Sequence, residues 1–174
     1  MTTIRKFKCR DILEYSNVNL DYYTETFHFP FYFEYLSKWP EMCFIAKDCN
    51  GRVEGYHFGK IEGEGEKYHG HLTAITIARE FRRIGLSNQL MFWLKQISEE
   101  ANCYYVDLFV RKSNETAIGM YHRLGYSVYR EILEYYSSNN ESAYDMRTPL
   151  PRDVDKKSII PLPKPIYADE ADDL

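Results

Sequence analysis

The sequence lacks the long apolar runs and the excess of positive charge that mark several classes of protein. No stretch approaches the roughly 18 apolar residues that a membrane-spanning helix needs, and residues 1–6 are not followed by the apolar segment of a secretory signal. The 22 Lys and Arg residues are outnumbered by 26 Asp and Glu residues, which gives a formal net charge of −4. We therefore expect a cytoplasmic protein that binds neither membranes nor, directly, nucleic acid.

The cysteine and glycine patterns argue against a metal site, a P-loop and a dinucleotide-binding site. The four cysteines show no paired spacing typical of metal ligands, so we expect free thiols and no bound metal. Cys9 and Cys103 lie in segments that we expect to be part of the hydrophobic core. Cys103 is a poor candidate for a catalytic nucleophile, because the sequence places no general base near it. The chain also lacks the lysine and Ser/Thr that end a P-loop and the three spaced glycines of a dinucleotide fingerprint.

The segment Arg82-Arg83-Ile84-Gly85-Leu86-Ser87 stands between a strand-like run, residues 72–78, and an amphipathic helix. A strand that turns through glycine into a helix leaves several backbone N–H groups unpaired at the positive end of the helix dipole. The two arginines add charged donors, and Gly85 has no Cβ to obstruct an anion. The segment predicts a phosphate-binding turn, and an ordinary tight turn with two solvated arginines is the alternative.

A second informative segment begins with a buried strand that we expect over residues 106–110. Ser113 and Asn114 follow it with side chains suited to cap a helix, and Gly125 suits the left-handed residue that ends one. Tyr121 lies on this helix, where it is either a core-facing aromatic residue or part of a site.

Length and segment order predict an α+β fold. A chain of 174 residues with 44% hydrophobic content can form one domain, which we expect over residues 1–149. A proline-rich, acidic-ended tail over residues 150–174 should be extended and poorly ordered unless it lies against the domain or a partner. We expect a mixed, mostly antiparallel sheet of about seven strands with about four helices, one of which starts within residues 11–16. The expected strands cover residues 3–8, 43–47, 53–61, 72–78, 106–110, 128–136 and 143–147, with a hairpin at Asn50-Gly51.

The two segments resemble the coenzyme A site of the GNAT N-acetyltransferase superfamily. Its loop pattern is Gln or Arg, two residues, Gly, one residue, then Gly or Ala; Arg82, Gly85 and Ser87 fill it, with Ser87 as a departure that remains small. The resemblance implies the GNAT fold and acetyl-CoA as co-substrate. It implies that Asn114 holds the pantetheine arm and that Tyr121 points at the coenzyme sulfur. The full set of residues expected at the coenzyme is Ile75, Thr76, Ile77, Arg82, Arg83, Ile84, Gly85, Leu86, Ser87, Asn114 and Tyr121.

Over residues 1 to about 167 the chain also resembles the catalytic subunits of NatB amino-terminal acetyltransferase complexes. The resemblance rests on segments such as Thr24-Glu25-Thr26, His69-Gly70-His71 and Lys156-Lys157-Ser158-Ile159-Ile160-Pro161-Leu162-Pro163. It implies acetylation of nascent chains that begin Met-Asp, Met-Glu, Met-Asn or Met-Gln. It also implies a large helical-repeat auxiliary subunit that brings the enzyme to the ribosome. The many aromatic residues, 16 Tyr and 10 Phe, exceed what we can place in one core and suit such an interface.

The residues present can be matched to that substrate. Phe27, Tyr135 and Tyr136 could line a pocket for the methionine side chain. His71 and Thr73, two apart on one strand, could donate hydrogen bonds to the second side chain, whereas His69 is assigned no role.

The chemistry needs a group that accepts the amine proton and groups that stabilise the leaving thiolate and the thioester carbonyl. We assign the first role to Glu25, through water, and the second to Tyr121. The backbone of the strand that includes Ala74 would polarise the carbonyl. Two other functions remain open: acetylation of lysine side chains or small amines, and a non-enzymatic acyl-CoA-binding subunit.

Overall fold

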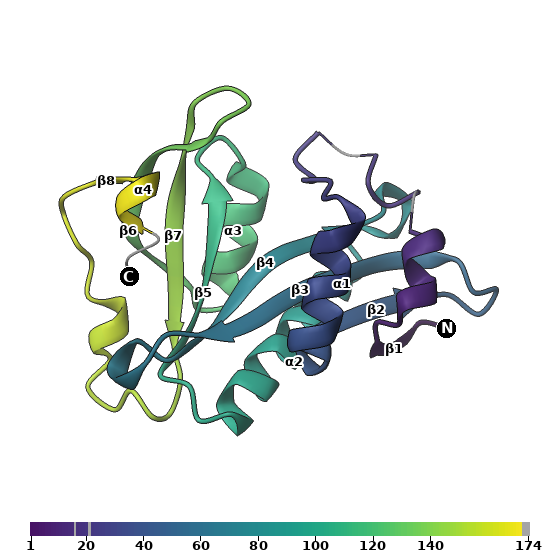
Figure 1. Cartoon of the computed structure of the whole chain (residues 1–174), viewed down its shortest axis with the longest axis horizontal. Coiled ribbons are helices and arrows are strands. Elements are labelled where there is room, and N and C mark those ends of the chain that lie inside the picture. The colour runs from purple at the N-terminus through teal and green to yellow at the C-terminus, as the bar shows by residue number, and fades with distance from the viewer. Residues whose placement is uncertain (16, 21, 172–174) are drawn as a thin grey trace. The chain divides into compact units, whose positions relative to one another are not determined.

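The computed structural model describes residues 1–15, 17–20 and 22–171, drawn in colour in Figure 1. The chain forms two compact units. Unit 1 consists of Met1–Ile61 and Leu72–Ile97, and unit 2 consists of Glu62–His71 and Ser98–Leu174.

Unit 1 is an antiparallel sheet with a helix on each face. The first strand pairs antiparallel with the second and the second with the third, and the fourth follows in the strand order. The first and second α-helices lie on opposite faces of these strands (Figure 1). The elements are β1 (Thr3–Lys6), α1 (Phe29–Lys38), β2 (Cys43–Lys47), β3 (Val53–Glu62), β4 (His69–Ile77), which begins in unit 2, and α2 (Leu86–Glu100), with short 3-10 helices η1 (Cys9–Leu13), η2 (Pro40–Met42) and η4 (Arg79–Phe81).

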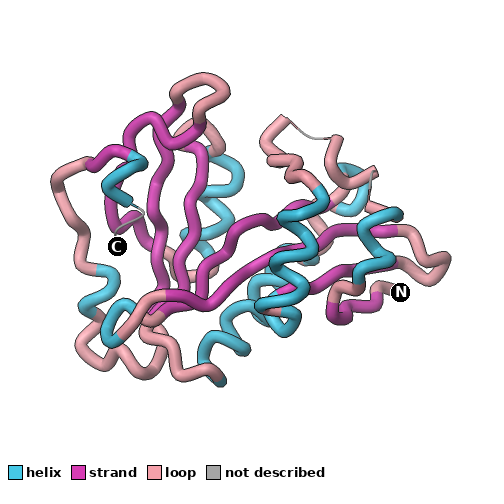
Figure 2. Tube along the Cα trace, viewed as in Figure 1, coloured by secondary structure: helices cyan, strands magenta, loops and turns pink. Residues whose placement is uncertain are grey.

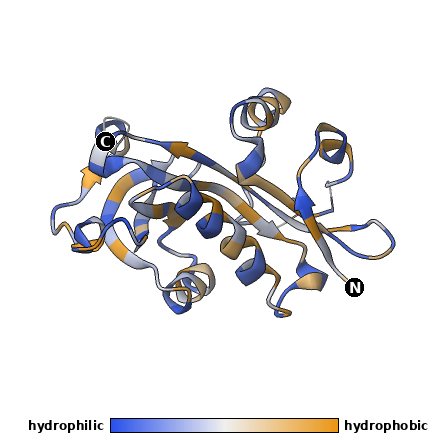
Figure 3. Ribbon diagram, turned by 90° about the horizontal axis from the view of Figure 1, so that it is seen from below, coloured by the Kyte–Doolittle hydropathy of each residue, from blue (hydrophilic) through white to orange (hydrophobic). Residues whose placement is uncertain are grey.

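Local sequence explains these elements. The β2–β3 turn is the expected hairpin: the Asp48 carboxylate accepts hydrogen bonds from the backbone N–H groups of Asn50 and Arg52, and Gly51 supplies the positive φ of 82°. In α2, Leu90 and its neighbours one turn before and after, Leu86 and Leu94, are buried, as expected of an amphipathic helix. Hydrophobic stretches recur along the strands and alternate with hydrophilic ones on the helices (Figure 3).

The core of unit 1 is unusually aromatic. Rings from α1, from β3 and from the segments that follow β1 and η1 contact one another with centroid separations of 4.8–6.3 Å, in tilted and edge-to-face arrangements. This core contains many of the aromatic residues that could not be assigned to a core from the sequence. The number of aromatic residues alone therefore does not indicate an interface. The buried rings are Phe7, Tyr15, Tyr32, Tyr35, Tyr56 and Phe58.

One expected helix is wrong. Instead of a helix starting within residues 11–16, the chain forms the 3-10 helix η1 at Cys9–Leu13, and Ser16 lies outside the described residues. The Asp11 side chain is fully buried and accepts hydrogen bonds from the Lys8 backbone N–H and the Arg5 guanidinium. These contacts fix a tight turn there, and they leave Cys9 exposed rather than in the core.

Unit 2 contains the start of β4 and four further strands. β5 (Tyr105–Arg111) pairs antiparallel with β7 (Glu141–Pro149), and β7 pairs antiparallel with β6 (Ser127–Tyr136). The strand order is β5-β7-β6-β8. Only the last of these pairings is parallel. The elements are η3 (Gly65–Lys67), β5 (Tyr105–Arg111), α3 (Glu115–Arg123), β6 (Ser127–Tyr136), β7 (Glu141–Pro149), η5 (Lys157–Ile159), β8 (Ile166–Tyr167) and α4 (Ala168–Ala171).

The part of the tail that the structure describes lies against unit 2. Leu150 N–H donates to the Tyr104 carbonyl, Leu162 N–H donates to the Tyr129 carbonyl, and β8 adds a parallel strand beside β6. Figure 2 shows mostly loop between η5 and β8. Residues 172–174, which include the acidic end, lie outside the described residues, and the domain boundary at Pro149 stays a prediction.

Eight strands and four α-helices over the described residues confirm an α+β fold with a mixed, mostly antiparallel sheet, with one strand more than expected. Among these residues, every helix is too short or too polar to cross a membrane.

Candidate active site

The turn from β4 to α2 in unit 1 has the features of an anion site. Arg83 and Gly85 both have positive φ, 66° and 81°, and a Cβ at Gly85 would have no atom within 4 Å. Arg82 Nε donates to the Ile77 carbonyl at 3.0 Å, which orients its guanidinium along the turn. Arg82, Arg83, Ile84 and Gly85 are exposed. The first amides of the 15-residue helix α2 therefore follow an open, basic turn.

The end of β4 in unit 1 is held close to β3. A Cβ at Gly55 would lie 2.5 Å from Ile77 Cδ1 and 2.7 Å from the Thr76 carbonyl oxygen, so only glycine allows this approach. The Ala78 backbone N–H also donates to the Glu54 carbonyl at 2.8 Å. Ala74 and Ile75 remain partly accessible. The strand predicted to face the thioester is thus firmly positioned within its unit.

Two hydroxyl contacts tie the N-terminal part of the chain to β4. Thr24 Oγ1 lies 3.0 Å from Thr76 Oγ1, and the Tyr35 hydroxyl lies 2.8 Å from Thr73 Oγ1. The first contact holds the loop that presents Glu25 at the surface. The second occupies one hydrogen-bonding direction of the Thr73 hydroxyl.

Phe27 continues this loop toward α1. Its ring stacks on Phe31 with the centroids 3.9 Å apart, and it meets Tyr32 edge to face at 6.3 Å. One side of Phe27 is therefore packed, and the partly exposed remainder can contribute to an apolar pocket.

In unit 2, α3 positions the two residues assigned to the coenzyme arm and sulfur. Asn114 is the N-cap: its Oδ1 accepts from the Ala117 N–H at 3.2 Å, so its amide NH₂ remains as the donor. Gly125 has φ 89° and ends the helix as predicted. Tyr121 is buried against Tyr126, and burial raises the pKa of its phenol above the ordinary value. Tyr121 therefore keeps its proton at neutral pH.

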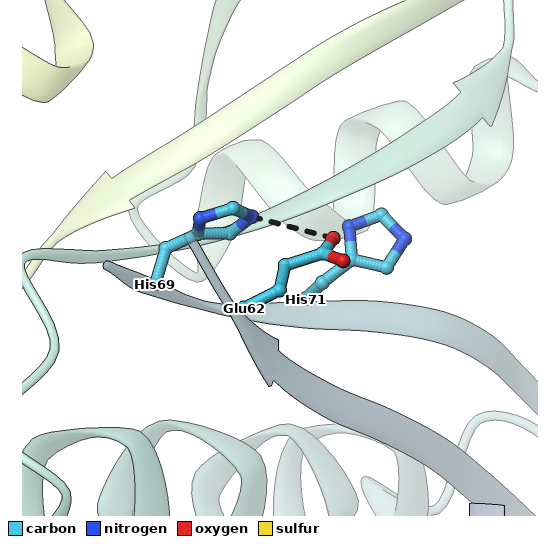
Figure 4. Close-up of side chains that lie close together, drawn as sticks. All are labelled: Glu62, His69 and His71. Atoms are coloured by element: carbon cyan, nitrogen blue, oxygen red, sulfur yellow. Dashed lines mark ion pairs between the residues drawn. The ribbon is translucent and has the colours of Figure 1, made fainter. Parts of the chain in front are cut away.

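A buried carboxylate joins the two histidines of β4 in the same unit. His71 Nδ1 lies 2.8 Å from Asp107 Oδ1, and His69 Nε2 lies 3.5 Å from Asp107 Oδ2 and 3.7 Å from Glu62 Oε1. His69 Nδ1 also lies 2.6 Å from the Lys67 carbonyl. Figure 4 shows the Glu62 carboxylate between the two imidazole rings. Burial alone would raise the pKa of the Asp107 carboxyl, but the adjacent His71 and His69 lower it to about 2.

The same residues are the candidates for holding a cation. Glu62, His69 and His71 each offer a ligand atom within 4.8 Å of the others. The short contacts of His71 Nδ1 and His69 Nδ1, however, are to a carboxylate and a carbonyl of the protein itself. We interpret the cluster as a hydrogen-bonded charge network.

A row of rings connects His71 to the paired tyrosines at the end of β6. The His71 ring contacts Phe109 at 5.1 Å, Phe109 contacts Tyr135 at 5.1 Å, and Tyr135 contacts Tyr136 at 5.0 Å. The Arg111 guanidinium lies 3.7 Å from the centroid of the Tyr136 ring, which fixes the far end of the row.

The predicted residues therefore fall into two groups. His71, Asn114, Tyr121, Tyr135 and Tyr136 belong to unit 2, where the structure brings His71 and the tyrosine pair together. The others belong to unit 1, and their joint action with the first group stays a prediction. These are Glu25, Phe27, Thr73, Ala74, Ile75, Thr76, Ile77, Arg82, Arg83, Ile84, Gly85, Leu86 and Ser87.

Sequence reasoning missed Asp107 and Phe109. The sequence did contain one indication of Asp107, which is the single carboxylate within the run Val106-Asp107-Leu108-Phe109-Val110. A buried aspartate must find partners, so its position in this strand points to an interaction with another side chain. Its partner, His71, lies 36 positions earlier in the chain, and only the order of the strands in the sheet shows that the two residues are neighbours.

The chain is similar in sequence and in structure to known acetyltransferases. The model of the acetyltransferase (GNAT) family matches residues 12–126. The chain is 57% identical over 173 residues, 99% of each chain, to N-alpha-acetyltransferase 20 of Dictyostelium discoideum. It is 52% identical over 171 residues, 98% of each chain, to the N-terminal acetyltransferase B complex catalytic subunit NAA20 of Arabidopsis thaliana. The crystal structure of Chaetomium thermophilum Naa20 in complex with a bisubstrate analogue superposes with a TM-score of 0.92 at 36% identity and covers 97% of this chain and 98% of that one. The chain belongs to the acetyltransferase (GNAT) family.

Proposed function

We propose that the protein is the catalytic subunit of a NatB-type complex. In this role it transfers an acetyl group from acetyl-CoA to the α-amine of nascent chains that begin Met-Asp, Met-Glu, Met-Asn or Met-Gln. The observation that carries the proposal is the open, basic turn between β4 and α2, where Gly85 leaves space beside the first amides of a long helix. The relatives named as NatB catalytic subunits support the substrate assignment.

The residues present fit the coenzyme. Arg82, Arg83 and the amides that follow Gly85 would bind the pyrophosphate, since charged donors and a helix N-terminus both favour an anion. The NH₂ group of Asn114 would bind the pantetheine arm. Acetyl-CoA supplies the acetyl group as a thioester.

The chain's own groups would then manage the protons. The α-amine has a pKa near 8 and must lose its proton before its nitrogen can bond to the acetyl carbon, and Glu25 accepts that proton through water. As the carbon–sulfur bond breaks, Tyr121 donates its phenolic proton to the leaving thiolate. Backbone N–H groups along Ala74 to Ile77 stabilise the negative charge on the carbonyl oxygen.

Substrate selection would rest on five residues outside the proposed coenzyme site. Phe27 and the rings of Tyr135 and Tyr136 provide apolar surface for the methionine side chain. His71 and Thr73 donate to the side chain of the second residue, and a tyrosine hydroxyl binds the peptide backbone.

We also propose a large helical-repeat auxiliary subunit that binds this chain and brings it to the ribosome in the cytoplasm. The Arabidopsis relative is named as a subunit of a complex, which supports a partner. Phe29 and Phe33 on α1 are more than half exposed, and exposed aromatic rings are enriched at interfaces.

The position of the acetyl group tests this function. A peptide that begins Met-Asp and contains an internal lysine is incubated with acetyl-CoA and the complex of this chain with its auxiliary subunit, and the product is sequenced by tandem mass spectrometry. We expect acetylation of the α-amine alone. Acetylation of the lysine would instead support a side-chain acetyltransferase, and coenzyme binding without any product would support a non-enzymatic subunit.

A further inference from the structure

We propose, on the basis of the proposed function, that Glu141 is a positioning residue for acetyl transfer. Its carboxylate joins the start of α3, where Asn114 is assigned to the coenzyme arm, to the end of the β6–β7 hairpin, where Tyr135 and Tyr136 are assigned to the peptide. All of these residues belong to unit 2. Glu141 acts through the groups that it holds in place rather than by touching a substrate.

The first oxygen of the carboxylate fixes the backbone just before α3. Glu141 Oε1 accepts a hydrogen bond from the Ser113 backbone N–H at 2.9 Å. The next residue is Asn114, whose N–H donates to the Arg111 carbonyl at 2.9 Å and whose Oδ1 accepts from the Ala117 N–H at 3.2 Å. The backbone on both sides of Asn114 is therefore held, and its NH₂ group is presented in one direction.

The second oxygen orients the guanidinium that covers Tyr136. Arg111 Nη1 donates to Glu141 Oε2 at 3.1 Å, and Asn139 Nδ2 donates to the same oxygen at 3.2 Å. The Arg111 guanidinium lies 3.7 Å from the centroid of the Tyr136 ring, and Tyr136 is paired with Glu141 across the hairpin. The carboxylate thus fixes the cation, and the cation fixes the ring.

This end of the hairpin needs such contacts because its backbone is irregular. The register of β6 against β7 shifts between Ile132 and Tyr136, and Glu134 within that interval has φ 53°. Asn140 in the turn also has φ 53°. Left-handed conformations are unfavourable for residues with a Cβ, so the surrounding structure must impose them. Side-chain contacts therefore supply the order that a regular strand ladder would otherwise give to the tyrosine pair.

The charges and burial of the two side chains favour a firm connection. Arg111 is 8% exposed, and the Glu141 side chain is 15% exposed. Hydrogen bonds from Ser113 lower the pKa of the Glu141 carboxyl to about 2, so it is an anion at neutral pH and its hydrogen bonds are charge-assisted. The hairpin turn and the start of α3, which these contacts join, lie at the same end of unit 2 (Figure 1).

A neighbouring ion pair provides a matched control. Lys112 Nζ lies 2.9 Å from Glu131 Oε1 and so also connects the end of β5 to β6. Its basic partner is the half-exposed Lys112 side chain, however, and not the Ser113 backbone or the Arg111 guanidinium. Removal of this charge in Glu131→Gln tests the effect of losing an ion pair between the same segments.

The test measures kcat and the KM values for acetyl-CoA and for a Met-Asp peptide, with the complex of this chain and its auxiliary subunit. Glu141→Ala removes both connections, and we expect both KM values to rise by roughly threefold to tenfold, as for the loss of one hydrogen bond at each binding site. Arg111→Lys keeps the charge but loses the planar guanidinium, so only the peptide KM should rise. Glu131→Gln should leave both KM values at those of the wild type.

The KM values separate positioning from stability. A variant that is merely less stable contains less folded enzyme, which lowers the apparent kcat and leaves KM unchanged. A lower kcat with wild-type KM values in Glu141→Ala would therefore overturn the inference, as would a wild-type peptide KM in Arg111→Lys. If Glu141→Ala does not fold, Glu141→Gln replaces it. Its one amide oxygen takes the place of two acceptors, so at least one KM should rise, and two unchanged values would overturn the inference.

Failure of the inference is distinguishable from failure of the proposed function. If Glu141 does not position the two sites, the wild-type complex still acetylates the Met-Asp peptide in preference to a Met-Leu peptide, and the variants keep its KM values. If the proposed function is wrong, the wild-type complex leaves the Met-Asp peptide unmodified or acetylates the Met-Leu peptide equally well.

Discussion

Thr24 Oγ1 lies 3.0 Å from Thr76 Oγ1, and this contact ties the loop that carries Glu25 to β4. The two residues are 52 positions apart in the chain. The hydrogen bond therefore positions the candidate proton acceptor relative to the strand that is expected to face the thioester.

Removing the Thr24 hydroxyl should loosen this loop without unfolding the protein. We expect Thr24→Val to lower the free energy of unfolding by about 1 kcal/mol, the net value of a typical hydrogen bond, and to lower kcat/KM by roughly tenfold through misplacement of Glu25. Thr26→Val, a neighbouring exposed position, serves as the control. Equal kcat/KM values for the two variants in steady-state kinetics would show that the contact between Thr24 and Thr76 does not position Glu25.

Replacing Gly85 with aspartate should weaken acetyl-CoA binding. The substitution adds a carboxylate at the predicted pyrophosphate site and strains a residue with φ 81° by about 1–2 kcal/mol. Gly51→Asp is a matched control because Gly51 has φ 82° and open space around it, in the β2–β3 turn. Calorimetry should show a loss of coenzyme affinity for Gly85→Asp alone. Equal affinities for the two variants would contradict the anion-site assignment.

Tyr121→Phe should lower kcat with little change in peptide KM, because the hydroxyl is required only as charge develops on sulfur. Tyr126→Phe tests the specificity of this effect. The Tyr126 hydroxyl is buried and has no hydrogen-bond partner among the described residues, so its removal should leave kcat near the wild-type value. If the two variants have the same kcat, Tyr121 is not the proton donor.

Acid sensitivity should depend on His57 of β3. Its ring is fully buried and stacks on Phe44 at 5.5 Å, and burial lowers the pKa of the imidazole to about 3. The unfolded residue has a pKa near 6.5, so the unfolded chain binds a proton that the folded chain does not. The stability contribution is complete above pH 6.5 and is lost as the pH falls toward 3, by up to about 1.4 kcal/mol per unit.

The variant His57→Phe should remove this part of the pH dependence. Urea unfolding at about pH 7 and pH 5.5 gives the slope for each protein. His28→Phe, at an exposed histidine, should retain the wild-type slope. A steep wild-type slope that persists in His57→Phe would show that another group causes it.

The parts of the site that depend on local geometry could be predicted from the sequence. The positive φ of Gly85, the cap formed by Asn114 and the helix stop at Gly125 are each set by a few neighbouring residues. The hairpin at Gly51 belongs to the same group. In each case the residue type admits few backbone conformations, so the pattern specifies the structure.

The parts that depend on distant partners could not be predicted. The role of Asp107 requires His71 to lie beside it on the neighbouring strand, and the sequence spacing does not encode that pairing. Asp11 reshaped an expected helix into a 3-10 turn because Arg5 and Lys47 converge on its carboxylate. The two-residue strand β8 follows a proline-rich segment, and only its pairing with β6 reveals it.

The most direct test of the central claim compares peptides that begin Met-Asp, Met-Leu and Ser, with acetyl-CoA and the auxiliary subunit present. A second side chain that accepts the hydrogen bonds of His71 and Thr73 should be favoured, because unpaired donors in the site cost about 1–3 kcal/mol. We predict a kcat/KM for Met-Asp at least about tenfold above those for Met-Leu and Ser, and loss of this preference in His71→Ala. Equal kcat/KM values for the three peptides would contradict the NatB assignment.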